Sequence, residues 1–181
     1  MQGDSGSDLY IGDYFVKRSG VVLVTINYRL GALGYATISK QITGNYGFYD
    51  QLLAFQWVAK EISVFGGNPN SVTIFGESAG GASVAAHLVS PKSSGLFHRA
   101  IIQSNPYSLP YRNDATSLGK NFAEKLVCEK NDFQCFLDKD VDSILAAQDA
   151  VSDSFNVFKP LEVKNAKKKT TKNLKSKKKN L

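Results

Sequence analysis

The chain has 181 residues, of which 43% are hydrophobic and 11% aromatic, a composition typical of one globular domain with a sizeable core. The formal net charge of +6 is uneven: the last eighteen residues hold nine lysines and no acid, whereas residues 1–163 carry 13 basic and 16 acidic residues. No run of about 18 apolar residues could span a bilayer. The polar start, MQGDSGSDLY, lacks the features of a signal peptide and does not indicate a location.

The hydrophobic pattern predicts alternating strands and helices. A continuous, mostly β-branched apolar run at residues 21–26 is typical of a strand covered on both faces in a parallel sheet. Apolar residues spaced by three or four predict a helix at residues 48–64. The other predicted elements are strands at 72–75 and 99–103 and helices at 79–89 and 115–127. Strands separated by helices imply right-handed crossovers and therefore a parallel, doubly wound α/β sheet.

The stretch Gly76-Glu77-Ser78-Ala79-Gly80 lies where the predicted strand 72–75 meets the predicted helix 79–89. A G-x-S-x-G pentapeptide in this position is typical of the sharp turn that presents a nucleophilic serine. Glycines on both sides fit a strained backbone in which side chains at positions 76 and 80 would clash. The N–H of Ala79 can contribute to an oxyanion hole, and the helix N-terminus adds positive potential. The alternative is an idle serine in a glycine-rich packing turn.

The sequence around this motif resembles a known family. The run FGGNPNSVTIFGESAG, residues 65–80, is similar to the active-serine signature of type-B carboxylesterases, the carboxylesterase and cholinesterase family of α/β hydrolases. Further similar blocks follow in family order at residues 27–31, 44–47, 50–51, 57–58 and 96–104. The resemblance implies a partial α/β-hydrolase fold in residues 1–160, with a mostly parallel sheet and helices on both faces. Residues 161–181 are expected to be a disordered, lysine-rich low-complexity tail.

The resemblance implies a serine hydrolase that cleaves carboxylic esters through an acyl-enzyme. Ser78 would attack the ester carbonyl, and water would then release the acid. Ala79 would donate its backbone N–H to the oxyanion. Glu77 is similar to the family glutamate that helps to organise the buried site, and its alternative role is that of a solvated turn acid. The expected partner is a small-molecule carboxylic ester, and no cofactor or metal is expected.

The family also pairs an arginine like Arg29 with an acid like Asp50, and we expect a structural role for this pair. Removing one partner of a buried ion pair is strongly destabilising because the other charge is stranded. The Arg29→Ala change is therefore expected to lower the yield of folded protein in a full-length context.

Two cysteines, Cys128 and Cys135, are too few for a disulfide-rich scaffold, and their spacing is not a zinc pattern. The residues alone leave two free thiols as the simplest interpretation. The surrounding segments resemble the family region in which two cysteines close a small surface loop, so the resemblance implies a Cys128–Cys135 disulfide. Together with the family, such a bridge suggests the secretory pathway, because disulfides persist in oxidising compartments.

The sequence departs from the family where the other triad members are expected. In α/β hydrolases the acid and the histidine follow the serine, but only His87 and His98 do so here. His87 lies about 13 Å along the predicted helix, and His98 begins the next strand at the end opposite Ser78. Both are expected to be structural or surface residues. The chain opens at residues 2–6 (QGDSG), just beyond the family's oxyanion loop. We therefore expect a partial domain that hydrolyses p-nitrophenyl esters no faster than its Ser78→Ala variant.

Two other classes of function stay open. One is a catalytically inactive, cholinesterase-like interaction or adhesion domain, against which the retained Ser78 argues. The other is a basic binding protein driven by the tail, which would leave the serine motif unexplained. The tail could bind anionic surfaces weakly, although no specific nucleic acid partner is expected. Tyr111 stands where the family has a large aromatic near the acyl pocket, and it either alters acyl preference or fills the same space.

Overall fold

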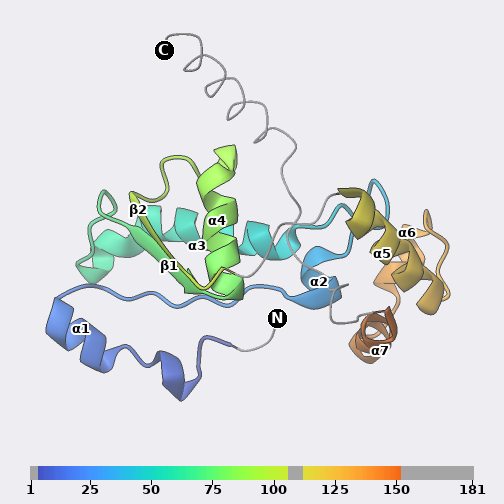
Figure 1. The fold of residues 1–181 in the computed structure, drawn as a ribbon, viewed down its shortest axis with the longest axis horizontal. Coiled ribbons are helices and arrows are strands. Elements are labelled where there is room, and N and C mark those ends of the chain that lie inside the picture. The colour runs from blue at the N-terminus through green and yellow to red at the C-terminus, as the bar shows by residue number, and fades with distance from the viewer. Residues whose placement is uncertain (1–3, 106–111, 152–181) are drawn as a thin grey trace, which may run out of the picture.

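The computed structural model describes residues 4–105 and 112–151 (Figure 1). The helices are α1 (Asp13–Ser19), α2 (Gly31–Tyr35), α3 (Tyr46–Glu61), α4 (Ala79–Val89), α5 (Arg112–Lys125), α6 (Phe133–Leu137) and α7 (Val141–Val151). The strands are β1 (Thr73–Glu77) and β2 (Arg99–Gln103), and three short 3-10 helices are η1 (Asp8–Tyr10), η2 (Ile62–Phe65) and η3 (Pro91–Ser93). Figure 1 shows the strands with α4 at one side of the molecule and α5, α6 and α7 at the other.

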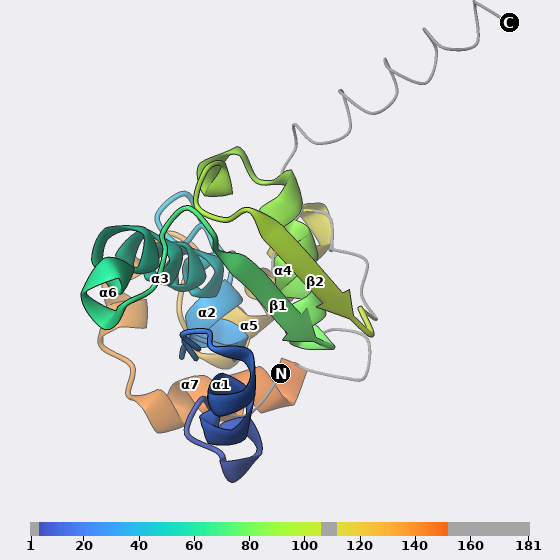
Figure 2. The same ribbon diagram turned by 90° about the vertical axis from the view of Figure 1, so that its left-hand side faces the viewer.

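Strands β1 and β2 form a parallel pair in the register from Thr73 opposite Arg99 to Glu77 opposite Gln103. Helix α4 connects them and packs against both strands, and Figure 2 shows it behind the pair. The helix can approach closely because its buried residues are mostly small, such as Gly81, Ala82 and Ala86. The predicted helix 79–89 and strand 99–103 are confirmed to the residue. The predicted strand 72–75 occurs as β1, which starts one residue later and ends two residues later.

The predicted strand at residues 21–26 is wrong. These residues form an extended segment between α1 and α2 that pairs with no strand in the described part of the chain (Figure 1). Their apolar side chains are correspondingly open, with Val21 and Val22 each 43% exposed. A strand exists only through its hydrogen bonds to a neighbour. The apolar pattern therefore indicates a segment that could form a strand. Without a neighbouring strand in the described residues, the segment stays irregular.

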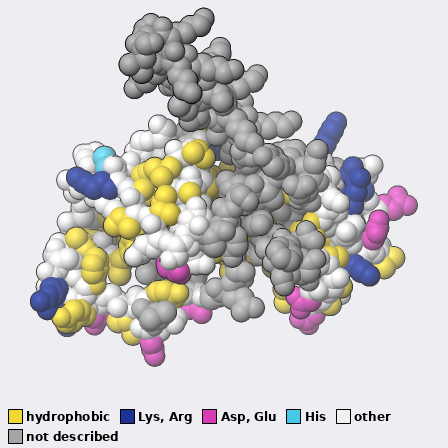
Figure 3. Space-filling view, in the orientation of Figure 1, with side chains coloured by type: hydrophobic (Ala, Val, Ile, Leu, Met, Phe, Trp, Pro, Cys, Tyr) yellow, Lys and Arg dark blue, Asp and Glu magenta, His cyan; other side chains and the backbone are white. Residues whose placement is uncertain are grey.

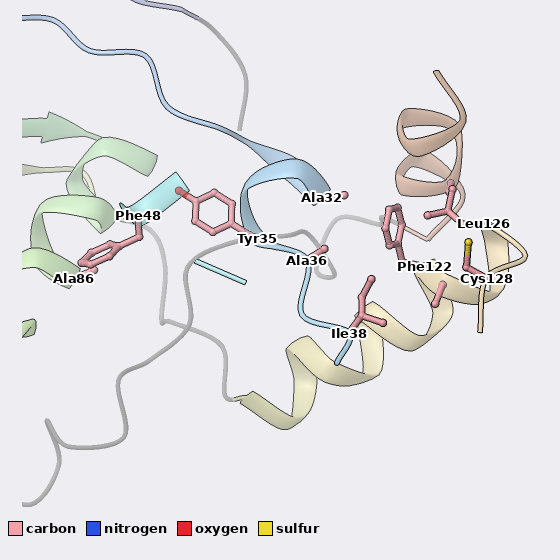
Figure 4. Packing of buried hydrophobic residues seen from close by; sticks show 11 residues of the cluster. Ala32, Tyr35, Ala36, Ile38, Phe48, Ala86, Phe122, Leu126 and Cys128 are labelled. Carbon is pink, nitrogen blue, oxygen red and sulfur yellow. The ribbon is translucent and has the colours of Figure 1, made fainter. Parts of the chain in front are cut away.

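The main core lies between the helices on both sides of α2. Figure 4 shows Tyr35 of α2 between Phe48 and Ala86 on one side and Ile38 and Phe122 on the other. Phe48 is 7% exposed, and burying one large apolar side chain of this kind contributes about 1.5–3 kcal/mol. This cluster joins the strand-bearing half to the α5–α7 half of the molecule.

A side chain of helix α7 binds the start of α2. The side-chain Oε1 of Gln148 accepts a hydrogen bond of 2.8 Å from the backbone N–H of Ala32. Ala32 lies in the first turn of α2, where backbone N–H groups have no partner within the helix. The glutamine therefore satisfies a donor that the short helix leaves open.

Cys128 and Cys135 form a disulfide with their Cα atoms 5.8 Å apart. The bridge closes the loop between α5 and α6, and the side chain of Asp132 caps α6 by accepting a hydrogen bond of 3.0 Å from the backbone N–H of Cys135. The disulfide expected from the family resemblance is confirmed, and the alternative of two free thiols is set aside.

The strand-bearing half exposes many large apolar side chains. Phe75 of β1 is 55% exposed and Ile101 of β2 is 51% exposed. Figure 3 shows apolar side chains gathered over this half. The described residues place α4 on one face of the strand pair, so much of the other face is open. Parallel strands are usually covered on both faces, so the described residues provide only part of the cover that this pair would need.

Within the described residues, no helix is both long and apolar enough to cross a membrane. The expected boundary between the domain and its lysine-rich tail, at residues 160 and 161, lies outside the described residues, and so does the tail.

Candidate active site

Ser78 occupies the sharp turn between β1 and α4. Its backbone has φ 53° and ψ −115°, a conformation that is uncommon for any residue with a side chain. Two hydrogen bonds hold this turn: the N–H of Ser78 donates to the carbonyl of Gln103 at 3.0 Å, and the N–H of Ala82 donates to the carbonyl of Ser78 at 3.0 Å. The local geometry is therefore the strained strand-to-helix turn that the pentapeptide predicts.

The glycines around Ser78 have different roles. A Cβ atom at Gly76 would lie 2.4 Å from the carbonyl carbon of Gly80, and one at Gly81 would lie 2.6 Å from the carbonyl oxygen of Gln103. Both positions thus need glycine for close backbone contact. At Gly80 a Cβ would meet no described atom within 4 Å, outside its own helix backbone. The expected clash of a side chain at position 80 is therefore wrong for the described residues.

The neighbours of Ser78 lie at the same edge of the sheet. Ala79 is the first residue of α4 and is half-buried, so its N–H belongs to the turn whose donors lack helical partners. Glu77 is the last residue of β1, opposite Gln103, and its side chain is exposed. The oxyanion role of Ala79 and the supporting role of Glu77 stay predictions.

Neither histidine approaches Ser78 as a base. His87 is 2% exposed, and its two ring nitrogens contact Ser93 Oγ at 2.8 Å and Gln51 Oε1 at 2.9 Å. His98 is exposed and accepts a hydrogen bond of 3.2 Å at Nδ1 from the backbone N–H of Val72, at the start of the strand pair. These contacts agree with the expected structural roles of both residues.

Sequence reasoning assigned no role to three residues that surround His87. Gln51, Ser83 and Ser93 form a buried hydrogen-bonded group with it, although they come from α3, α4 and η3. The available signals were Ser83 in the middle of an apolar helix and Gln51 on the apolar side of another helix. Pairing them requires the packing of the helices, which the sequence does not show.

Arg29 and Asp50 form the predicted ion pair. The guanidinium donates two hydrogen bonds to the Asp50 carboxylate, at 2.8 Å and 2.7 Å, and the backbone N–H of Arg29 adds a third at 3.0 Å. The side-chain hydrogen bonds of this pair lower the pKa of Asp50 and raise the pKa of Arg29. The expectation of a buried pair is wrong, however, since the two side chains are 54% and 25% exposed.

We expect the Arg29→Ala change to lower the free energy of unfolding by about 1 kcal/mol, because the pair is bidentate but open to solvent. Urea unfolding followed by circular dichroism measures the difference. The matched control is Lys60→Ala, which removes an exposed contact of 2.8 Å to Glu61 and should change stability by less than about 0.5 kcal/mol. Equal losses in the two variants would contradict a specific role for the Arg29 pair.

No group of three metal-ligating side chains occurs within residues 4–105 and 112–151. Two surface hollows, one beside Asp13 and Leu23 and one beside Lys125 and Ser143, do not include Ser78. Ser78 and Ala79 are half-buried at the carboxyl end of β1, and Glu77 beside them is exposed. Tyr111, expected near the acyl pocket, lies outside them.

Comparisons with known proteins agree with this arrangement. The profile of the carboxylesterase family matches residues 1–180. The crystal protein of Dictyostelium discoideum is 42% identical over 170 residues, which are 88% of this chain and 30% of the relative. Acetylcholinesterase of Danio rerio is 45% identical over 146 residues, which are 71% of this chain and 23% of that enzyme.

Solved esterase structures show the same fold. The carboxylesterase EST55 of Geobacillus stearothermophilus superposes with a TM-score of 0.83 at 34% identity, over 89% of this chain and 36% of its own. A thermophilic pNB esterase gives a TM-score of 0.84 at 32% identity, over 91% and 36%. The chain thus spans about a third of the solved structures, and the predicted partial α/β-hydrolase fold is confirmed. By sequence and by fold, this chain belongs to the carboxylesterase family.

Proposed function

We propose that the chain carries the nucleophile region of a serine carboxylic ester hydrolase that acts on small-molecule esters. One observation carries the proposal: Ser78 is held at φ 53° and ψ −115° where a parallel strand meets the N-terminus of a helix. Backbone strain at a polar residue is commonly kept where it serves a site. Membership of the family supports ester hydrolysis in general.

The chemistry assigns a step to each residue. Ser78 Oγ would attack the ester carbonyl carbon, the ester C–O bond would break with release of the alcohol, and water would then release the acid. The N–H of Ala79 would donate to the oxyanion, and Glu77 would support the turn. The hydroxyl proton of Ser78 needs a general base during the attack. The chain has two histidines, and both are engaged elsewhere.

We therefore expect this polypeptide alone to hydrolyse p-nitrophenyl acetate no faster than its Ser78→Ala variant. In a chimera, residues 4–151 would replace the matching segment of the Geobacillus carboxylesterase, whose remaining chain would complete the domain. There the Ser78→Ala change should lower the rate at least about 10³-fold. Ser94→Ala, at an exposed serine, is the matched control and should leave the rate unchanged.

A folded chimera without Ser78-dependent hydrolysis would overturn the proposal. The alternative would then be an inactive cholinesterase-like interaction domain.

The Cys128–Cys135 disulfide supports maturation in an oxidising compartment, and thus secretion or passage through the secretory pathway.

A further inference from the structure

A chain of buried hydrogen bonds runs through the helices behind the Ser78 turn. We call it the relay, and its side chains are Ser93, His87, Gln51 and Ser83, which are 0%, 2%, 3% and 6% exposed. It ends at the backbone carbonyl of Ala79. The successive distances are 2.8 Å from Ser93 Oγ to His87 Nδ1, 2.9 Å from His87 Nε2 to Gln51 Oε1, 3.2 Å from Gln51 Nε2 to Ser83 Oγ and 3.0 Å from Ser83 Oγ to the Ala79 oxygen.

The last link decides the direction of every other one. A carbonyl oxygen can only accept, so the single hydroxyl proton of Ser83 is donated to Ala79. Ser83 Oγ must then accept from the amide nitrogen of Gln51, which turns the amide oxygen of Gln51 toward His87. His87 Nε2 must therefore carry a proton, and its Nδ1 accepts from the hydroxyl of Ser93.

All four hydrogen bonds thus point the same way, and such chains polarise and strengthen one another in a low-dielectric interior. The alternative direction would turn the Ser83 hydroxyl toward Gln51 and leave the Ala79 contact without a proton.

Two aromatic rings also pack against the ring of His87. Phe48 stacks on it with ring centroids 4.1 Å apart and an interplanar angle of 18°, and the Phe55 ring lies 4.5 Å away. The nearby charged residues have other partners: Asp50 of α3 binds Arg29, and Lys92 of η3 lies over the Tyr49 ring. Helix α4 has no titratable residue besides His87 itself. A neutral ring suits this environment.

We propose that His87 is a positioning residue for the Ser78 turn. With its proton on Nε2, His87 donates to Gln51, and Gln51 orients Ser83 to donate to the carbonyl of Ala79. His87 thereby holds the first turn of α4 in place. The relay connects that turn to α3 and to η3, in addition to the hydrogen bond that joins Ser78 to Gln103 of β2. The assignment of a positioning role rests on the proposed function, whereas the direction of the relay rests on geometry alone.

The experiment is nuclear magnetic resonance on the full chain with ¹⁵N-labelled histidine and alanine labelled with both ¹³C and ¹⁵N. The chain has two histidines, so the exposed His98 is an internal reference for His87. We expect His87 to show a protonated Nε2 and an unprotonated Nδ1 at neutral pH. A proton on Nδ1 instead would overturn the proposal without any mutation.

The positioning role is tested with Gln51→Glu against the matched control Gln56→Glu, which adds the same charge at an exposed position of α3. The new carboxylate has no N–H for Ser83, so the Ala79 carbonyl resonance and the Ala79 amide should shift in the first variant and stay in place in the second. Ser83→Ala removes the donor to Ala79 directly and serves if Gln51→Glu does not fold. Unchanged Ala79 resonances would overturn the role. None of these readouts needs catalysis, so failure of the proposed esterase activity is distinguishable.

Discussion

Replacing Gly76 by alanine is expected to lower the free energy of unfolding by about 3 kcal/mol or more, the upper end of what overpacking does in a core. The added Cβ would lie 2.4 Å, 2.5 Å and 2.8 Å from the carbonyl carbon, oxygen and Cα of Gly80. These are backbone atoms of the first turn of α4, so no side-chain rotation relieves the contact. The turn that holds Ser78 would have to open. Urea unfolding followed by circular dichroism measures the loss.

The matched control is Gly80→Ala, in the same pentapeptide. A Cβ there meets no described atom within 4 Å outside its own helix, and alanine is favoured over glycine inside a helix by about 1 kcal/mol. The control should be as stable as the parent chain or slightly more stable. If both changes had the same effect, close contact at Gly76 would not be what shapes the turn.

Acid is expected to destabilise the fold between pH 6.5 and pH 4, by about 3 kcal/mol across the whole interval. Burial lowers the pKa of His87 from 6.5 to about 4. In this interval the unfolded chain binds a proton at His87 that the folded chain does not bind. The contribution of neutral His87 to the free energy of unfolding is therefore fully present above pH 6.5 and is lost as the pH falls toward 4. The urea midpoint, measured at steps from pH 7 to pH 4.5, follows the change.

The His87→Gln variant is the control, because glutamine has no proton to gain in this range. It should be less stable than the parent chain at pH 7, and its stability should depend much less on pH above 4.5. Asp50 does not contribute to this pH dependence. Its pKa is lowered from 3.8, so the stability that it adds is lost only at more acidic pH. A parent chain with a flat profile from pH 7 to pH 4.5 would show that His87 is not held neutral by the fold.

Short-range signals were enough for β1, α4 and β2. A β-branched or apolar run followed by glycines and small residues fixes where a strand ends and a helix begins, and these elements appear at the predicted positions within a few residues. The predicted helices at 48–64 and 115–127 occur as α3 and α5 with earlier starts, Tyr46 and Arg112. The sequence did not reveal α1, α2, α6 or α7, since none of them has both a long apolar stripe and a clear stop. Asp140, which caps α7 by accepting from the backbone N–H of Ser143 at 2.7 Å, was the missed signal.

The family, and Ser78 as the proposed nucleophile, follow from local residues, because the pentapeptide and the blocks around it are contiguous in the chain. Contacts between distant residues needed the tertiary structure. The segment 21–26 has the pattern of a strand but lacks a described partner, and the Arg29–Asp50 pair forms but stays open to solvent. His87 could be removed from the triad by its position, yet its link to Ala79 depends on Gln51, 36 residues earlier in the chain. Hydrogen bonds and burial depend on which segments meet in space, and spacing along a chain does not encode that directly.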